Sequence, residues 1–148
     1  MALKEILKWP LIVAAIVVVL RVIVERGGAS AAVSNMLSVA ALTTVLGPLY
    51  FAFQIGLARK PHPYLMLIQL IFIYALCARA MVLPIYWAAR MFNWTESRFA
   101  GVDAPNPLVG FIALPLITAV FWIGASMVTG SVIGFITLAM VRSRMKTS

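Results

Sequence analysis

Long apolar stretches, separated by short charged clusters, run along the whole chain. Charged residues are absent from residues 27–58, 61–78 and 104–141. A further apolar run extends from Trp9 to Val24 and contains a single charge, Arg21. Because about 20 apolar residues in a helix cross a bilayer, each stretch is a candidate membrane span. We therefore predict transmembrane helices at approximately residues 9–25, 33–58, 63–92 and 107–141.

The composition supports this assignment and excludes several classes of soluble protein. Of the 148 residues, 64% are hydrophobic and 11% are charged, and the chain has one cysteine and one histidine. This inventory excludes a disulfide scaffold and a zinc or cluster site built from Cys and His. The net charge of +8 does not indicate a nucleic-acid partner, because the basic residues lie at the edges of apolar segments. We predict an all-α, polytopic integral membrane protein: one domain, a four-helix bundle in a lipid bilayer, without metal or cofactor.

Proline positions predict that the helices are not all straight. Gly47-Pro48 lies inside the second span and Pro84 inside the third, and each proline removes a backbone donor. The third and fourth spans are longer than a bilayer requires, so we expect both to be bent at the outer face. Two arrangements stay open for residues 107–115: a re-entrant or interfacial segment, or part of one tilted helix.

The distribution of Lys and Arg predicts the orientation. Seven basic residues fall on the side of the two termini: Lys4, Lys8, Arg59, Lys60, Arg142, Arg144 and Lys146. Three fall on the other side: Arg26, Arg90 and Arg98. This bias predicts cytoplasmic termini, an N-in/C-in topology. Short loops and the lack of a transit-peptide pattern lead us to expect a prokaryotic inner (plasma) membrane.

Three charged residues inside the spans are the most informative positions. Counted along the helices from the cytoplasmic edge, Arg21 lies at about 18 Å, Glu25 at about 24 Å and Arg79 at about 22 Å. A charge at the centre of a membrane helix costs about 2.5 to 3.5 kcal/mol on insertion scales. Glu25 is the one carboxylate within helical reach, so two arginines on it leave about one positive charge uncompensated.

Two interpretations of this surplus charge stay open. In the first, Arg21 and Arg79 snorkel to lipid phosphates or meet Asp103 or Glu96 from the loop, and the cluster only sets the register of the helices. In the second, the cluster binds an anionic solute or a lipid headgroup. Arg79, Tyr86 and Arg90 are spaced by seven and four residues and share one helix face. The candidate anion site is therefore formed by Arg21, Glu25, Arg79, Tyr86 and Arg90.

Two further polar or small-residue patterns predict helix contacts. Gln54 and Gln69 are expected to share a depth in adjacent spans and to hydrogen-bond each other. Alternatively, they form a polar gate together with residues further along the second span: Thr43, Thr44 and Ser38. Ser126, Gly130 and Gly134 recur at four-residue spacing and form a small-residue column. Such a column lets a helix approach closely, either within the same chain or in a homo-oligomer.

The functional expectation is divided between two classes. A set of His, acid and nucleophile, paired carboxylates in a span and a phosphate-binding glycine loop are all missing from the sequence. The first class is a non-catalytic subunit or assembly partner in a membrane complex, packing through its last helix. The second is a homo-oligomeric channel or carrier for an anionic solute or lipid headgroup. A lipid-modifying enzyme with Glu25 as base is a third alternative, which the neighbouring arginines oppose.

Overall fold

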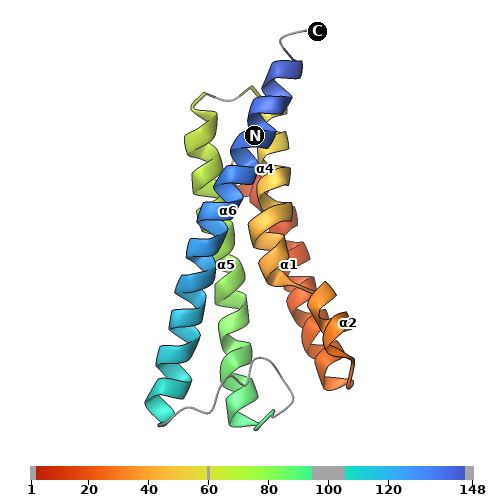
Figure 1. The fold of residues 1–148 in the computed structure, drawn as a ribbon, viewed down its shortest axis with the longest axis vertical. Coiled ribbons are helices and arrows are strands. Elements are labelled where there is room, and N and C mark those ends of the chain that lie inside the picture. Colours follow the sequence, from red (N-terminus) through yellow and green to blue (C-terminus); the bar gives the residue numbers. More distant parts are fainter. Residues whose placement is uncertain (1–2, 60, 95–105, 146–148) are drawn as a thin grey trace.

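The computed structural model describes residues 3–59, 61–94 and 106–145, and the regular structure in these ranges is helical (Figure 1). The elements are α1 (Leu3–Arg26), α2 (Ala31–Met36), α3 (Val39–Ala41), the π-helical turn η1 (Leu42–Leu46), α4 (Gly47–Leu57), α5 (Pro63–Met91), the π-helical turn η2 (Val109–Ala113) and α6 (Leu114–Arg144). Within the described residues, four helical segments are long and apolar enough to cross a membrane. This confirms the predicted all-α class and the four helices of spanning length.

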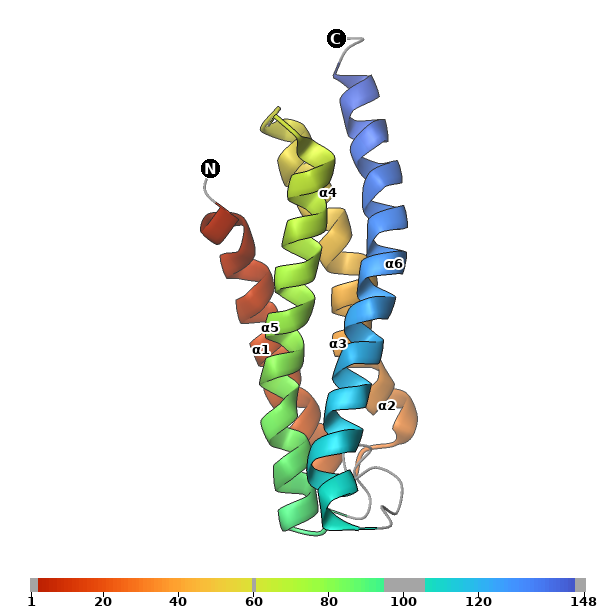
Figure 2. The same ribbon diagram turned by 90° about the vertical axis from the view of Figure 1, so that its left-hand side faces the viewer.

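The four long segments lie side by side along one direction (Figures 1 and 2). Both chain ends lie at the end of the bundle that carries the turn from α4 to α5, which we call the terminal end. The last turn of α5, α2 and the first turns of α6 lie at the other end, which we call the loop end. α6 packs against α4 and α5, whereas α1 packs mainly against α5.

The terminal half of the bundle holds the larger hydrophobic core. Side chains from α1, α4, α5 and α6 are buried there together, among them Ile6, Phe51, Leu67, Tyr74 and Leu138. The rings of Phe51 and Tyr74 meet edge to face at 5.5 Å. A smaller cluster around Val18, Ala78 and Val82 fills the loop half. The outward faces carry many exposed large apolar side chains, as expected for helices that contact lipid.

The second crossing is shorter than the predicted span of 33–58. The helix is interrupted at Leu37–Ser38, and the continuous crossing covers Val39–Leu57. Ser38 is the cause, because its hydroxyl accepts a hydrogen bond of 3.3 Å from the backbone N–H of Ala41 and so caps a new helix start. A serine in an uncharged run is easily read as part of a continuous span.

Two prolines lie directly after π-helical turns. Gly47 donates its N–H to the carbonyl of Leu42, five residues back, just before Pro48. Leu114 donates in the same way to Val109 just before Pro115. A proline lacks the N–H and its ring crowds the carbonyl four residues earlier, so widening the preceding turn relieves the conflict. Gly47-Pro48 was predicted to disturb its helix, and the disturbance in the structure is the π-helical turn that precedes these residues.

The long third and fourth helices are continuous. Pro84 lies inside α5, which runs unbroken to Met91, and the bend expected there stays a prediction. η2 and α6 form one helical segment of 36 residues, Val109–Arg144. This segment measures about 54 Å, well beyond the hydrocarbon core of about 30 Å. Residues 109–115 are therefore helical and continuous with the rest of α6, and their placement relative to the membrane stays a prediction.

Candidate functional site

Arg79 is a buried arginine, and two of its three guanidinium nitrogens lack a hydrogen-bond partner among the described residues. It lies on the buried face of α5 beside Ala75, Ala78 and Val82, with 8% of its surface exposed. The guanidinium carbon lies 5.1 Å from the ring centre of Trp122 on α6. Its Nε and Nη2 atoms are buried, and neither has a hydrogen-bond partner among the described residues. The positive charge therefore has a cation–π contact, while the N–H donors on Nε and Nη2 have no acceptor among the described residues.

Glu25 pairs with Arg21 on its own helix. Arg21 Nε donates a hydrogen bond of 3.0 Å to Glu25 Oε1, four residues later on α1. Within residues 3–59, 61–94 and 106–145, Arg79 forms no ion pair with Glu25 or with another carboxylate. The alternative partners considered for the arginines, Glu96 and Asp103, lie outside the described residues. One carboxylate shared by both arginines is thus not the arrangement found.

Tyr86 belongs to the same cluster, whereas Arg90 lies elsewhere. Tyr86 is within electrostatic range of Arg79, Arg21 and Glu25. Arg90 instead lies against Gly110 in η2, where a Cβ atom would overlap its guanidinium. The structure therefore brings together Arg21, Glu25, Arg79 and Tyr86, which we call the Arg79 cluster, and directs Arg90 to the contact between α5 and η2.

The Arg79 cluster is closed toward the terminal end. Tyr74, Ile71 and Leu70, which precede Arg79 on α5, are 0–1% exposed and belong to the larger core. That core draws on all four long helices, so packed side chains fill the bundle between Arg79 and the terminal end. At the loop end, the guanidinium carbon of Arg26 lies 5.0 Å from the centre of the Trp94 ring.

The two glutamines are not joined in the structure. Gln69 is exposed on α5 and Gln54 is half-buried on α4, and the described residues contain no hydrogen bond between them. Leu67, Leu70 and Ile71, which neighbour Gln69 in the sequence, occupy the buried face of α5. Gln69 therefore points outward. Equal depth in adjacent helices does not place two side chains on facing surfaces.

Two buried hydroxyl groups, on α6 and η1, form a hydrogen bond between helices. Ser126 on α6 donates a hydrogen bond of 3.0 Å to the hydroxyl of Thr43 in η1. Thr43 in turn donates to the carbonyl of Val39 at 3.1 Å. Both side chains are fully buried. From the sequence, Thr43 was assigned to a polar gate and Ser126 to a packing column. The presence of small polar residues in both segments was the one sequence feature from which a hydrogen bond between them could have been predicted.

The small-residue column of α6 packs inside the chain. A Cβ atom on Gly130 would lie 2.8 Å from Pro48 Cγ, and one on Gly134 would lie 2.9 Å from Leu67 Cδ2. Together with Ser126 on Thr43, these contacts attach α6 to α4, η1 and α5. The column therefore forms the intrachain contact, the first of the two alternatives considered for it.

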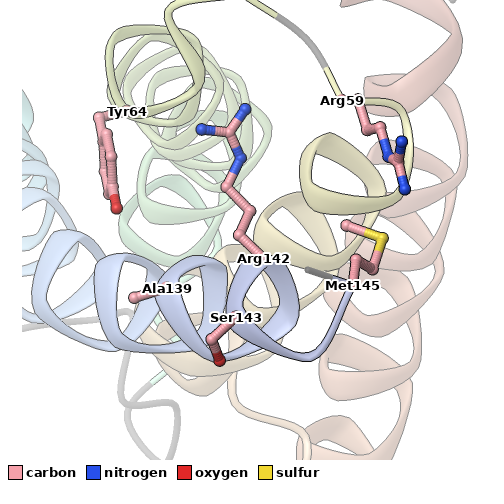
Figure 3. A pocket seen from close by; sticks show the side chains of 6 residues that line it. All are labelled: Arg59, Tyr64, Ala139, Arg142, Ser143 and Met145. Atoms are coloured by element: carbon pink, nitrogen blue, oxygen red, sulfur yellow. The ribbon is translucent and has the colours of Figure 1, made fainter. Parts of the chain in front are cut away.

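A cavity that the sequence did not predict lies at the terminal end. It has a volume of about 630 Å³ (Figure 3). Its lining comes from the end of α4, the first turn of α5 and the last turns of α6: Arg59, Tyr64, Ala139, Arg142, Ser143 and Met145. Sequence analysis used Arg59 and Arg142 only to orient the chain, because nothing in the sequence indicates that these elements converge.

Comparisons with protein-family models, curated proteins and solved structures find no match to this chain. The described residues also contain no group of three or more His, Cys, Asp or Glu side chains that could hold a metal ion.

Proposed function

We propose that this membrane protein binds an anionic group, from a solute or a lipid, at the Arg79 cluster and acts as a carrier for it. The observation that carries the proposal is the buried edge of Arg79, formed by Nε and Nη2, which has no hydrogen-bond partner among the described residues. These two atoms present parallel N–H bonds, the geometry that receives two oxygens of a carboxylate or phosphate. An anion at this edge would satisfy both donors.

The energetics favour an anionic occupant over an empty site. A cation–π contact such as that with Trp122 contributes about 0.5 to 2 kcal/mol, but it leaves the N–H donors without acceptors. A buried, unsatisfied charged donor costs more than the about 1–3 kcal/mol of a neutral one. Since Glu25 already neutralises Arg21, the charge of Arg79 is the surplus that an anion would neutralise. Binding therefore recovers free energy that the folded chain alone does not.

The closed terminal side supports a carrier and not an open channel through one chain. The packed core around Tyr74 separates the Arg79 cluster from the terminal end. An anion bound from the loop end would cross only if the bundle changed conformation. We further propose an inner (plasma) membrane with both termini cytoplasmic, on the basis of the uneven Lys and Arg distribution.

The rival proposal, a non-catalytic subunit that packs through its last helix, has weaker support. The column proposed as its contact surface faces Thr43, Pro48 and Leu67 of the same chain. The remaining face of α6 is apolar and equally suited to lipid. A subunit role would therefore need a different contact surface.

The proposal is tested by comparing Arg79→Met with Arg26→Met. Both substitutions remove one positive charge from the loop half, but Arg26 lies over Trp94 and outside the Arg79 cluster. The purified protein is titrated with inorganic phosphate, acetate and vesicles of phosphatidylglycerol, and binding is read from the shift in thermal unfolding. We expect the shift with at least one probe to vanish in Arg79→Met and to persist in Arg26→Met. An equal response in both variants would contradict the proposal.

A further inference from the structure

The cavity at the terminal end combines positive charge with an aromatic wall. Figure 3 shows the guanidinium of Arg142 between Tyr64 and Arg59, which lie on opposite sides of the cavity. Its volume of about 630 Å³ is within the range of about 300–1,000 Å³ that is typical of small-molecule sites. The cavity is thus large enough for a polar headgroup and lined by groups that donate hydrogen bonds.

The surroundings of the cavity are strongly basic. Five basic residues lie at this end among the described residues: Lys4, Lys8, Arg59, Arg142 and Arg144. Glu5 is the one acidic residue described at this end, and it belongs to α1, which packs mainly against α5. An anion near Arg59 and Arg142 therefore meets a net positive field.

An apolar stripe continues from the cavity along α6. Val128, Val132 and Ile136 follow the helical spacing that leads to Ala139, and they are 68%, 56% and 58% exposed. The Tyr64 ring lies edge to face on Phe135 at 5.3 Å, at the junction of cavity and stripe. A charged cavity above an exposed apolar stripe matches an amphipathic molecule better than a soluble anion.

We propose that this cavity binds the phosphate headgroup of an anionic phospholipid. Arg59 and Arg142 donate hydrogen bonds to the phosphate oxygens, as guanidinium groups do with particular strength. The acyl chains lie on the stripe formed by Val128, Val132 and Ile136. This site is at the opposite end of the bundle from the Arg79 cluster, and it does not depend on the function proposed there.

The test measures lipid retention by native mass spectrometry of the purified protein in detergent. The probes are phosphatidylglycerol and phosphatidylcholine with the same acyl chains, and inorganic phosphate serves as the soluble competitor. The variants are Arg142→Gln and Arg59→Gln, and Lys8→Gln is the matched control because it removes one charge from the same end without lining the cavity. Thermal unfolding checks that each variant is folded.

We expect the wild type to retain phosphatidylglycerol in preference to phosphatidylcholine. Each cavity variant should weaken this retention about tenfold, as expected for the loss of a charge-assisted hydrogen bond, and Lys8→Gln should retain the wild-type value. An equal loss in Lys8→Gln, or no loss in the two cavity variants, would overturn the proposal. Inorganic phosphate that binds as tightly as the lipid would also overturn it, because the occupant would then be a soluble anion.

Discussion

The indole Nε1 of Trp87 donates a hydrogen bond of 2.7 Å to the carbonyl oxygen of Phe111, which lies in the π-helical turn η2, four residues before Pro115. In an α-helix the carbonyl of residue 111 would accept from the N–H of residue 115, which proline lacks. Trp87 on α5 replaces that donor from another helix. The contact therefore links α5 to η2 and also satisfies a group that would otherwise be costly inside a membrane.

Removing this donor should destabilise the protein in a way that Pro115 controls. We expect Trp87→Phe to lower the free energy of unfolding by about 1–3 kcal/mol, because the carbonyl of Phe111 loses its partner. In a Pro115→Ala background the residue at 115 regains an N–H, so the effect of Trp87→Phe should shrink. A double-mutant cycle in detergent measures both effects, and equal costs in the two backgrounds would show that Trp87 does not compensate for the N–H missing at Pro115.

Enlarging the small-residue column should loosen the bundle. Gly134→Leu forces a side chain into Leu67, and we expect it to lower stability by about 1–3 kcal/mol or more. Gly124→Leu is the matched control, because a Cβ at residue 124 meets no atom within 4 Å. Thermal unfolding of both variants provides the comparison. If Gly124→Leu is as damaging as Gly134→Leu, the column is not the contact surface of α6.

The hydroxyl pair of Thr43 and Ser126 should show modest coupling. Interhelical hydrogen bonds in membranes average about 0.6 kcal/mol in double-mutant cycles, so Ser126→Ala and Thr43→Val should couple by about that amount. Thr43→Val should cost more on its own, because it also removes the bond to the carbonyl of Val39. Zero coupling energy would mean that the two hydroxyls pack without bonding.

The charge cluster predicts opposite effects for its two key residues in the absence of an anion. Glu25→Gln removes the carboxylate that forms the ion pair with Arg21, so we expect a clear loss of stability. Arg79→Met removes a buried charge that lacks a carboxylate partner, so it should leave stability unchanged or raise it. Thermal unfolding in anion-free buffer checks the order. A larger loss for Arg79→Met would show that this side chain is satisfied in a way the proposal does not include.

Topology can be tested by cysteine labelling in a Cys77→Ala background. The uneven distribution of Lys and Arg predicts that an impermeant reagent outside intact cells labels Ser97→Cys and does not label Ser148→Cys. The opposite labelling pattern would reverse the predicted orientation.

Hydrophobic length and charge spacing predicted the helical class and the four spanning segments. They also singled out Arg21, Glu25 and Arg79 as residues at one depth, because helical rise converts sequence position into depth. Depth alone does not tell which way a side chain points around its helix, however. This explains why Gln54 and Gln69, which were predicted to share a level, form no hydrogen bond with each other. Capping by Ser38 and the π-helical turns before Pro48 and Pro115 depend on local hydrogen bonds that periodicity does not reveal.

The terminal cavity could not be predicted for a different reason. Arg59 and Arg142 are separated by more than eighty positions, and their approach depends on how α4, α5 and α6 converge. The partner of Glu25 was likewise undecided, since Arg21 and Arg79 are both within reach by sequence. Only the packed arrangement assigns Glu25 to Arg21 and leaves Arg79 over Trp122.

The most direct test of the account is anomalous diffraction from crystals grown in lipid with selenate, a heavy-atom analogue of sulfate and phosphate. The account predicts an anomalous peak within hydrogen-bond distance of the Nε and Nη2 edge of Arg79, which disappears in Arg79→Met crystals. Arg79 bonded to a carboxylate of its own chain, with no anomalous density at that edge, would contradict it.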